Sequence, residues 1–157
     1  MISVVFERIL KKVNSVVNGV DLSKIAQDAE DRIRTRTRLG YGVEGGERGG
    51  SRVKLKALSE KYVNQRKKQK SFNRSLTTAK KSNLTRTGQL LDSIRSRVIG
   101  KKIELFFTER RKDGVKNKDL VEWQSEKGRD FFELTNKEIT GLRNQLKKDL
   151  IKALRRK

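Results

Sequence analysis

The sequence contains no cysteine and no histidine. Without cysteine the chain can form neither a disulfide nor a thiolate metal site, and without histidine it lacks the commonest general base and the commonest transition-metal ligand. Apolar residues make up only 33% of the 157 residues, which suits a single domain with a modest core. We therefore expect no large catalytic core, no cofactor and no enzymatic activity.

Acidic residues are also scarce. Nineteen Asp and Glu face 40 Lys and Arg, which gives a formal net charge of +21 and predicts attraction to a polyanion or an acidic partner, nucleic acid above all. The N-terminus is apolar for only a few residues before Glu7 and Arg8, so we expect neither a signal peptide nor a membrane span. The composition favours a soluble protein made in the cytosol.

Two apolar stripes at helical spacing open the chain. The first predicts a core-facing helix, with a helix lying on a membrane surface as the alternative, and comprises Ile2, Phe6, Ile9, Val13, Val16 and Val20. Gly19 weakens or breaks this helix. Asp21 or Ser23 can cap a second one, whose apolar side is Leu22, Ile25, Ala26, Ala29 and Ile33.

Glycine is concentrated in one place, at six of the eleven positions from Gly40 to Gly50. A phosphate-binding loop would need Lys-Ser or Lys-Thr after its last glycine, and Ser51-Arg52 stands there instead. We therefore predict a mobile loop that continues into a basic segment, so that a flexible arm spans about residues 40–83.

The basic segment from Ser51 to Arg86 carries twelve Lys or Arg and one acid, Glu60, which leaves +11. Ser59 can cap a short helix through Tyr62 and Val63. Beyond it the chain is rich in Ser, Thr and Asn and is either a solvated connector or a surface that faces phosphates or acidic partners. The candidate residues for such contacts are Arg66, Lys67, Lys68, Lys70, Arg74, Lys80 and Lys81.

The stretch Ser82–Val98 is the most ordered in the sequence. Thr87 can cap a helix whose apolar face is Leu90, Leu91, Ile94 and Val98. Gly100-Lys101 suits a two-residue hairpin turn, and residues 102–107 then alternate like a strand. We therefore predict a central helix that leads into a small antiparallel sheet.

Downstream, residues 119–124 are expected to form a short helix that is closed near Gly128, with Trp123 as a packing anchor. Four acids invite a metal-dependent nuclease hypothesis, although no recognisable nuclease signature surrounds Asp113, Asp119, Glu122 and Glu126. Residues 129–133 suit a short strand, and Thr135 with Glu138 matches a capping box that starts the last helix. Its apolar side would be Ile139, Leu142, Leu146, Leu150 and Leu154.

These elements predict an α+β fold in one domain, residues 1–157: an N-terminal helix or helix pair, a long basic flexible arm, a central helix, a small antiparallel sheet, and a C-terminal helix packed on that sheet. No internal repeat is visible in the sequence.

Three segments resemble a known family, and their order along the chain agrees with the order in that family. Leu84–Ile94 has the pattern Leu-Thr-x-Thr-Gly-x-Leu-Leu-x-Ser-Ile, Glu126–Thr135 has Glu-x-Gly-Arg-x-Phe-Phe-x-Leu, and Leu58–Tyr62 has Leu-Ser-x-x-Tyr. Together they resemble the neck and tail-completion proteins of tailed bacteriophages, the virion-morphogenesis or head-tail connector group. The residues of the resemblance are Leu84, Thr87, Gly88, Leu90, Leu91, Ile94, Gly128, Arg129, Phe131 and Phe132.

The resemblance implies a non-enzymatic structural protein of the virion neck, assembled in the cytoplasm of the host bacterium. Such a protein would form a homo-oligomeric ring of six or twelve copies between the portal or adaptor and the tail terminator or tail tube, around double-stranded DNA and without contact with a membrane. Positive charge and a mobile arm are compatible with this role, and the resemblance suggests that the arm becomes ordered only against neighbouring subunits. The alternative from composition alone is a nucleic-acid-binding module without sequence specificity.

Overall fold

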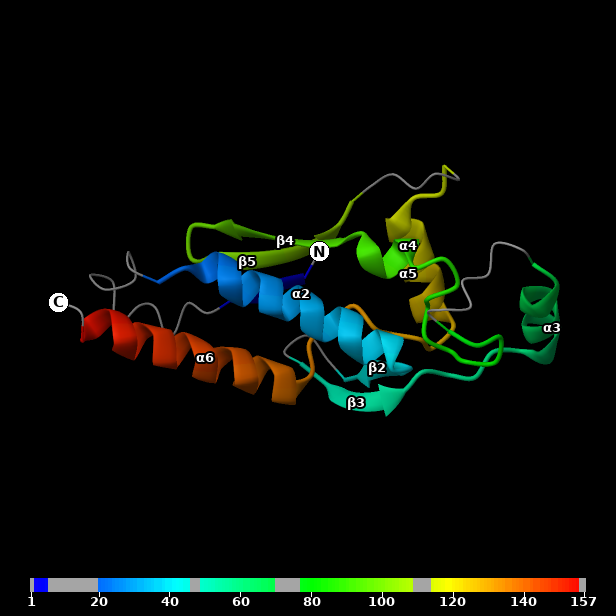
Figure 1. Ribbon diagram of the computed structural model, residues 1–157, viewed down its shortest axis with the longest axis horizontal. Helices are drawn as coiled ribbons and strands as arrows, with labels where there is room; N and C mark the ends of the chain where they lie inside the picture. The colour runs from blue at the N-terminus through cyan, green and yellow to red at the C-terminus, as the bar shows by residue number, and fades with distance from the viewer. Residues whose placement is uncertain (1, 6–19, 46–48, 70–76, 109–113, 156–157) are drawn as a thin grey trace.

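The computed structural model describes residues 2–5, 20–45, 49–69, 77–108 and 114–155. They form an elongated α+β molecule in which helices α2 and α6 run side by side and a three-stranded antiparallel sheet lies over α2 (Figure 1). The elements are β1 (Ile2–Val5), α2 (Leu22–Arg38), β2 (Tyr41–Glu44), β3 (Ser51–Lys54), α3 (Glu60–Lys68), α4 (Gln89–Asp92), β4 (Ile94–Ile99), β5 (Lys102–Phe107), α5 (Asn117–Glu126) and α6 (Asn136–Leu154). The α+β class is as predicted.

Helix α2 is the central element, and it follows the sequence prediction closely. The carboxylate of its N-cap, Asp21, accepts a hydrogen bond from the backbone N–H of Ser23 at 2.9 Å. The whole predicted apolar stripe is buried: Leu22, Ile25, Ala26, Ala29 and Ile33. Helix α2 thereby packs against the sheet on one side and against α6 on another.

The predicted N-terminal helix is wrong at its start. Residues Ile2–Val5 form β1, which pairs antiparallel with β5 and makes it the central strand of the order β1-β5-β4. The four residues include three that are β-branched, Ile2, Val4 and Val5, and such residues favour strands. The rest of that predicted helix, residues 6–19, lies outside the described residues.

The predicted central helix is also wrong for most of its length. Helix α4 has only four residues, and Ile94–Ile99 is strand β4, paired antiparallel with β5. Ile94 and Val98 are four residues apart, an interval that fits one helical face but equally places both side chains on one face of a strand. The hairpin itself is confirmed: Ile99 pairs with Lys102, so Gly100-Lys101 is the turn, and Gly100 has a φ of +58°.

The glycine-rich stretch is not irregular where the structure describes it, because β2 and β3 form an antiparallel hairpin. Gly42 lies so close to the chain after α5 that a Cβ atom there would be 2.1 Å from the carbonyl oxygen of Asp130. At the other end of the hairpin, the backbone N–H of Asn136 donates to the carbonyl of Gly50 at 3.0 Å. These glycines allow close backbone approach, which corrects the prediction of a mobile loop; residues 46–48 lie outside the described part.

Helix α6 begins with the predicted capping box. Thr135 Oγ1 accepts from the N–H of Glu138, and the Glu138 carboxylate accepts from the N–H of Thr135. Leu142, Leu146 and Leu150 are buried, whereas Ile139 is half-buried and Leu154 is 49% exposed. The buried leucines join the same apolar core as Ile103 and Leu105 of β5.

The predicted strand at 129–133 is absent. These residues form an irregular segment. Arg36 of α2 donates to the carbonyls of Phe131 at 2.7 Å and Glu133 at 2.6 Å, and the backbone N–H of Val43 in β2 donates to the carbonyl of Asp130 at 2.8 Å. Phe131 and Phe132 are buried and pack with Phe107 of β5, whose ring centroid is 4.1 Å from that of Phe132. Burial of these rings, together with the hydrogen bonds from Arg36 and Val43, thus fixes the segment without a strand at 129–133.

Candidate functional site

Helix α3 carries the first half of the candidate basic surface, and it lies at one end of the long axis (Figure 1). The N-cap prediction is confirmed, because Ser59 Oγ accepts from the N–H of Tyr62. Tyr62 and Val63 are half-buried, whereas Lys67 and Lys68 are exposed. The helix therefore presents a cationic face to solvent.

Arg66 is not part of that face, contrary to the prediction. Its residue surface is only 3% exposed, and its guanidinium donates to the carbonyl of Lys81 at 3.1 Å. The guanidinium also lies 5.8 Å from the ring centroid of Tyr62. Burial lowers the pKa of Arg66, an effect that the nearby Tyr62 opposes. Arg66 therefore joins α3 to the returning chain and is not available for a phosphate.

The returning chain, residues 77–83, is held by polar side chains that the sequence analysis did not single out. The hydroxyl of buried Thr77 donates to Asn83 Oδ1 at 2.7 Å, and Asn83 Nδ2 donates to the carbonyl of Arg38 at 3.2 Å. Asn83 is fully buried, and it ties this segment to the C-terminal end of α2. A buried amide within a run of Lys, Ser and Thr leaves no periodic signal in the sequence, which is why it was missed.

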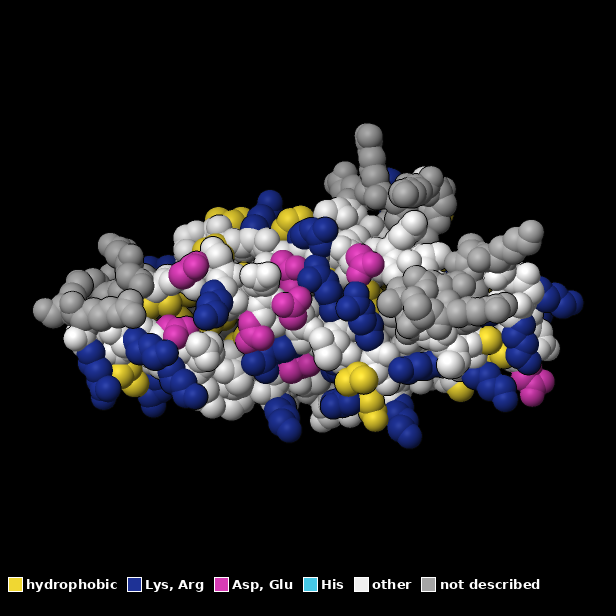
Figure 2. Space-filling model, in the orientation of Figure 1, with side chains coloured by type: hydrophobic (Ala, Val, Ile, Leu, Met, Phe, Trp, Pro, Cys, Tyr) yellow, Lys and Arg dark blue, Asp and Glu magenta, His cyan; other side chains and the backbone are white. Residues whose placement is uncertain are grey.

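The remaining described candidates form what we call the exposed lysine set: Lys67, Lys68, Lys80 and Lys81. Within the described ranges, none of the four has an acidic partner within ion-pair distance. Basic side chains, Lys or Arg, are seen at the end of the molecule that carries α3 (Figure 2). Unpaired ammonium groups of this kind suit phosphates or acidic side chains. Lys70 and Arg74 lie outside the described residues.

The apolar residues of Leu84–Ile94 belong to the core or pack against it. Leu90, Leu91 and Ile94 are buried in the core, and Leu84 is half-buried with a φ of +54°. Thr87 does not cap α4, contrary to the prediction; the N-cap is Gly88, with a φ of +79° and no side-chain hydrogen bond.

Arg34 of α2 fixes the next turn of that segment. Its guanidinium donates to the carbonyl of Leu91 at 3.1 Å and to that of Ile94. It also pairs with Glu30 at 2.7 Å, and Glu30 in turn accepts a hydrogen bond from Ser96 of β4. The Leu84–Ile94 segment and the strand that follows it are therefore bound to α2 through Arg34 and Glu30.

Arg129 connects the Glu126–Thr135 segment to the backbone of the chain between β3 and α3. Gly128, with a φ of +66°, ends α5 as predicted, and the Arg129 guanidinium then donates to the carbonyls of Lys56 at 3.2 Å and Ala57 at 3.0 Å. Those two residues immediately precede Leu58, the start of the third motif. Arg129 thus binds the backbone directly before the Leu58–Tyr62 segment.

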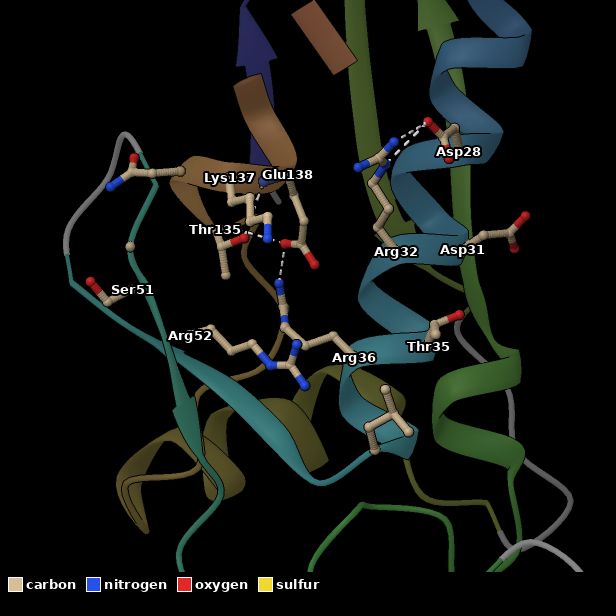
Figure 3. A pocket seen from close by; sticks show the side chains of 13 residues that line it. Asp28, Asp31, Arg32, Thr35, Arg36, Ser51, Arg52, Thr135, Lys137 and Glu138 are labelled. Atoms are coloured by element: carbon tan, nitrogen blue, oxygen red, sulfur yellow. Dashed lines mark hydrogen bonds and ion pairs between the residues drawn. The ribbon is translucent and has the colours of Figure 1, made fainter. Parts of the chain in front are cut away.

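A groove of about 750 Å³ lies between α2, strand β3 and the start of α6 (Figure 3). Arg36, 4% exposed, forms an ion pair across it with Glu138. Burial lowers the pKa of the Arg36 guanidinium, while Glu138 acts in the opposite direction. Arg52 stacks over the ring of Tyr41, 3.7 Å from its centroid.

The acids on the groove walls are already engaged. Asp28 pairs with Arg32 at 2.9 Å, Asp31 with Arg34 at 3.2 Å, and Glu138 with Arg36. None of these pairs has the form of a nucleophile beside a general base. The groove is therefore best explained as a structural junction that fixes the start of α6 against α2.

The acids of the nuclease hypothesis are arranged along one exposed face of α5. Asp119, Glu122 and Glu126 are all exposed, and Asp113 lies outside the described residues. Among the residues that the structure describes, no group of three or more His, Cys, Asp or Glu is placed to hold a metal ion. Trp123, predicted to be a packing anchor, is 48% exposed and is covered by the ammonium of Lys127, 3.3 Å from its ring centroid.

No family model, curated protein or solved structure matches this chain. The resemblance to phage neck proteins therefore depends on the motif segments alone. In the described part of the chain, every helix is too short or too polar to cross a lipid bilayer.

Proposed function

We propose that this protein is a structural component of the neck of a tailed bacteriophage, where it forms a ring at the head–tail junction around the DNA channel. In this role it acts by shape and contact, without catalysis. It joins the portal or adaptor on one side to the tail terminator or tail tube on the other.

The arrangement of the motif segments is the observation that carries the proposal. Leu90, Leu91 and Ile94 of one segment and Phe131 and Phe132 of another are buried in a single core. Arg129 reaches back to Lys56 and Ala57, beside the third segment. Since these residues support the fold and do not line a reaction centre, the motifs favour a family defined by a scaffold over one defined by chemistry.

The charge distribution supports a position beside DNA. The chain carries a net charge of +21, and the exposed lysine set has no acidic partner among the described residues. Cations that line a channel neutralise phosphates without reading the base sequence. A free nucleic-acid-binding module without sequence specificity would use the same lysines, but it would not need the ordered motif segments.

Deletion of the gene from the phage that encodes the protein tests the proposal. We expect filled heads and complete tails that remain unjoined, and infectious particles should return when the intact gene is supplied in trans. As a matched control, a gene with the exposed lysine set changed to Ala separates loss of the protein from loss of its charge. Normal, infectious particles that lack the protein would exclude a neck role.

A further inference from the structure

Helix α5 presents an exposed stripe, in which the indole of Trp123 is covered only by the ammonium of Lys127 among the described residues. Asp119, Glu122, Trp123 and Glu126 follow a spacing of three, one and three residues, so they share one face of the helix, and all four are exposed. Glu122 meets only Lys118 among the described cations, at 3.5 Å, in a pair whose side chains are 60% and 82% exposed. The indole is 48% exposed although Lys127 lies over its ring, and three carboxylates share its face, so the stripe favours a cationic, partly apolar partner.

The C-terminal half of α6 carries a stripe of the opposite charge. Ile151 is 41% and Leu154 49% exposed, although both are large apolar residues. Exposed cations flank them at helical spacing: Lys147, Lys148 and Arg155. Within the described ranges, none of these three cations is paired with an acid.

The two stripes match in chemistry but cannot meet within one molecule. The C-terminal end of α6 lies at one end of the long axis, and α5 lies toward the other (Figure 1). One exposed apolar side chain on α5 and two on α6 each lie among three charges of one sign. Contact between the two stripes therefore requires two copies of the chain.

We propose that the acidic, Trp123-bearing face of α5 on one copy docks on the basic, Ile151-bearing face of α6 on the next. The contact joins two different surfaces, so each copy keeps one of each free, and the series closes into a ring where the rotation between neighbours allows it. The inference deepens the proposed neck function and rests on it only for the identity of the ring. A contact built from two small stripes is weak for an isolated pair and gains strength from ring closure.

Single-cysteine variants test this pairing cleanly, because the chain has no cysteine of its own. Lys118→Cys places a thiol beside the α5 stripe and Asn144→Cys places one beside the α6 stripe, and both positions are exposed. A flexible bis-maleimide should link the mixture of the two full-length variants faster than it links either variant alone. Equal rates, or faster linking of either variant to itself, would overturn the proposal.

Charge reversal identifies the surfaces. We expect Glu122→Lys/Glu126→Lys in the Lys118→Cys protein, or Lys147→Glu/Lys148→Glu in the Asn144→Cys protein, to slow the mixed reaction about tenfold, a factor that corresponds to about 1.4 kcal/mol. Combining both reversals should restore the rate. Lys67→Glu/Lys68→Glu in the Asn144→Cys protein makes the same charge change as the α6 reversal and should leave the rate unchanged. No recovery in the combined reversal, or equal slowing by this control, would reject the proposed surfaces.

This test is independent of the neck role. Specific linking in solution by a protein that is absent from phage particles would reject the neck function and leave the interface in place. Location at the neck without specific linking would reject only the interface.

Discussion

The buried guanidinium of Arg36 is the side chain on which the junction of α2, α6 and the segment after α5 most depends. It is 4% exposed, pairs with Glu138, and donates to the carbonyls of Phe131 and Glu133. Arg36→Met keeps much of the side-chain volume and removes every donor. We expect the free energy of unfolding to fall by about 3–5 kcal/mol, as when one partner of a buried ion pair is removed.

The magnitude follows from what the substitution leaves behind. Two backbone carbonyls lose a charged donor, and the carboxylate of Glu138, whose side chain is 14% exposed, keeps only its capping-box partner at the N–H of Thr135 among the described groups. Urea unfolding followed by circular dichroism measures the decrease in stability. Glu138→Gln, made alone and together with Arg36→Met, completes a double-mutant cycle. The glutamine keeps an acceptor for the capping box.

The matched control is Arg38→Met, two residues along the same helix. Arg38 pairs with Asp92 at 2.7 Å, but the two side chains are 44% and 57% exposed, so the expected decrease is within about 1 kcal/mol. If Arg36→Met costs no more than Arg38→Met, the argument that Arg36 organises this junction is refuted.

Three further predictions concern the core, a carboxyl group and the basic surface. Leu91→Ala should cost on the order of 2–5 kcal/mol in urea unfolding, because Leu91 is fully buried; a cost below about 1 kcal/mol would contradict its place in the core. Burial, and to a lesser extent Asp130, raises the pKa of Glu133, so the stability that its protonated carboxyl contributes is present below the ordinary Glu pKa and is lost as pH rises through the raised pKa. Glu133→Gln should therefore stabilise the protein at pH 7 and lose that advantage in acid. A gain in stability that does not depend on pH would contradict the raised pKa. Changing the whole exposed lysine set to Ala should flatten the slope of log affinity for duplex DNA against log salt by about 0.9 for each phosphate that the protein no longer neutralises, with stability changed by about 0.5 kcal/mol or less per site, and an unchanged slope would show that these lysines do not meet phosphate.

The parts of the fold that could be predicted from sequence are those set by local chemistry. Asp21 before an apolar stripe, Ser59 before α3, and Thr135 with Glu138 each fixed a helix start, because caps act over three residues. The Gly100-Lys101 turn was predictable for the same reason, since its two residues alone set the hairpin.

The parts that failed depend on partners far along the chain. Gly42 is required by the carbonyl of Asp130, which is distant in sequence, so its role could not be distinguished from loop flexibility. Arg66 resembles any other exposed cation until the carbonyl of Lys81 is placed beside it. Ile94 and Val98 fit a helix and a strand equally well, and pairing with β5 decides between them.

The candidate surface was predicted in part. Lys67, Lys68, Lys80 and Lys81 are exposed, as their charge and setting indicate. The exposed stripe of α5 was missed because Trp123 was predicted to be a packing anchor, and a tryptophan between Glu122 and Glu126 is distinguished from a core residue only by what packs on it.

The most direct test of the neck role is an electron cryo-microscopy reconstruction of the head–tail junction in particles of the encoding phage. We predict a closed ring of density between portal and tail into which repeated copies of the α2–α6 pair and its three-stranded sheet fit, with the ring absent from particles that lack the gene. A junction whose density is fully accounted for by other chains would contradict the proposal.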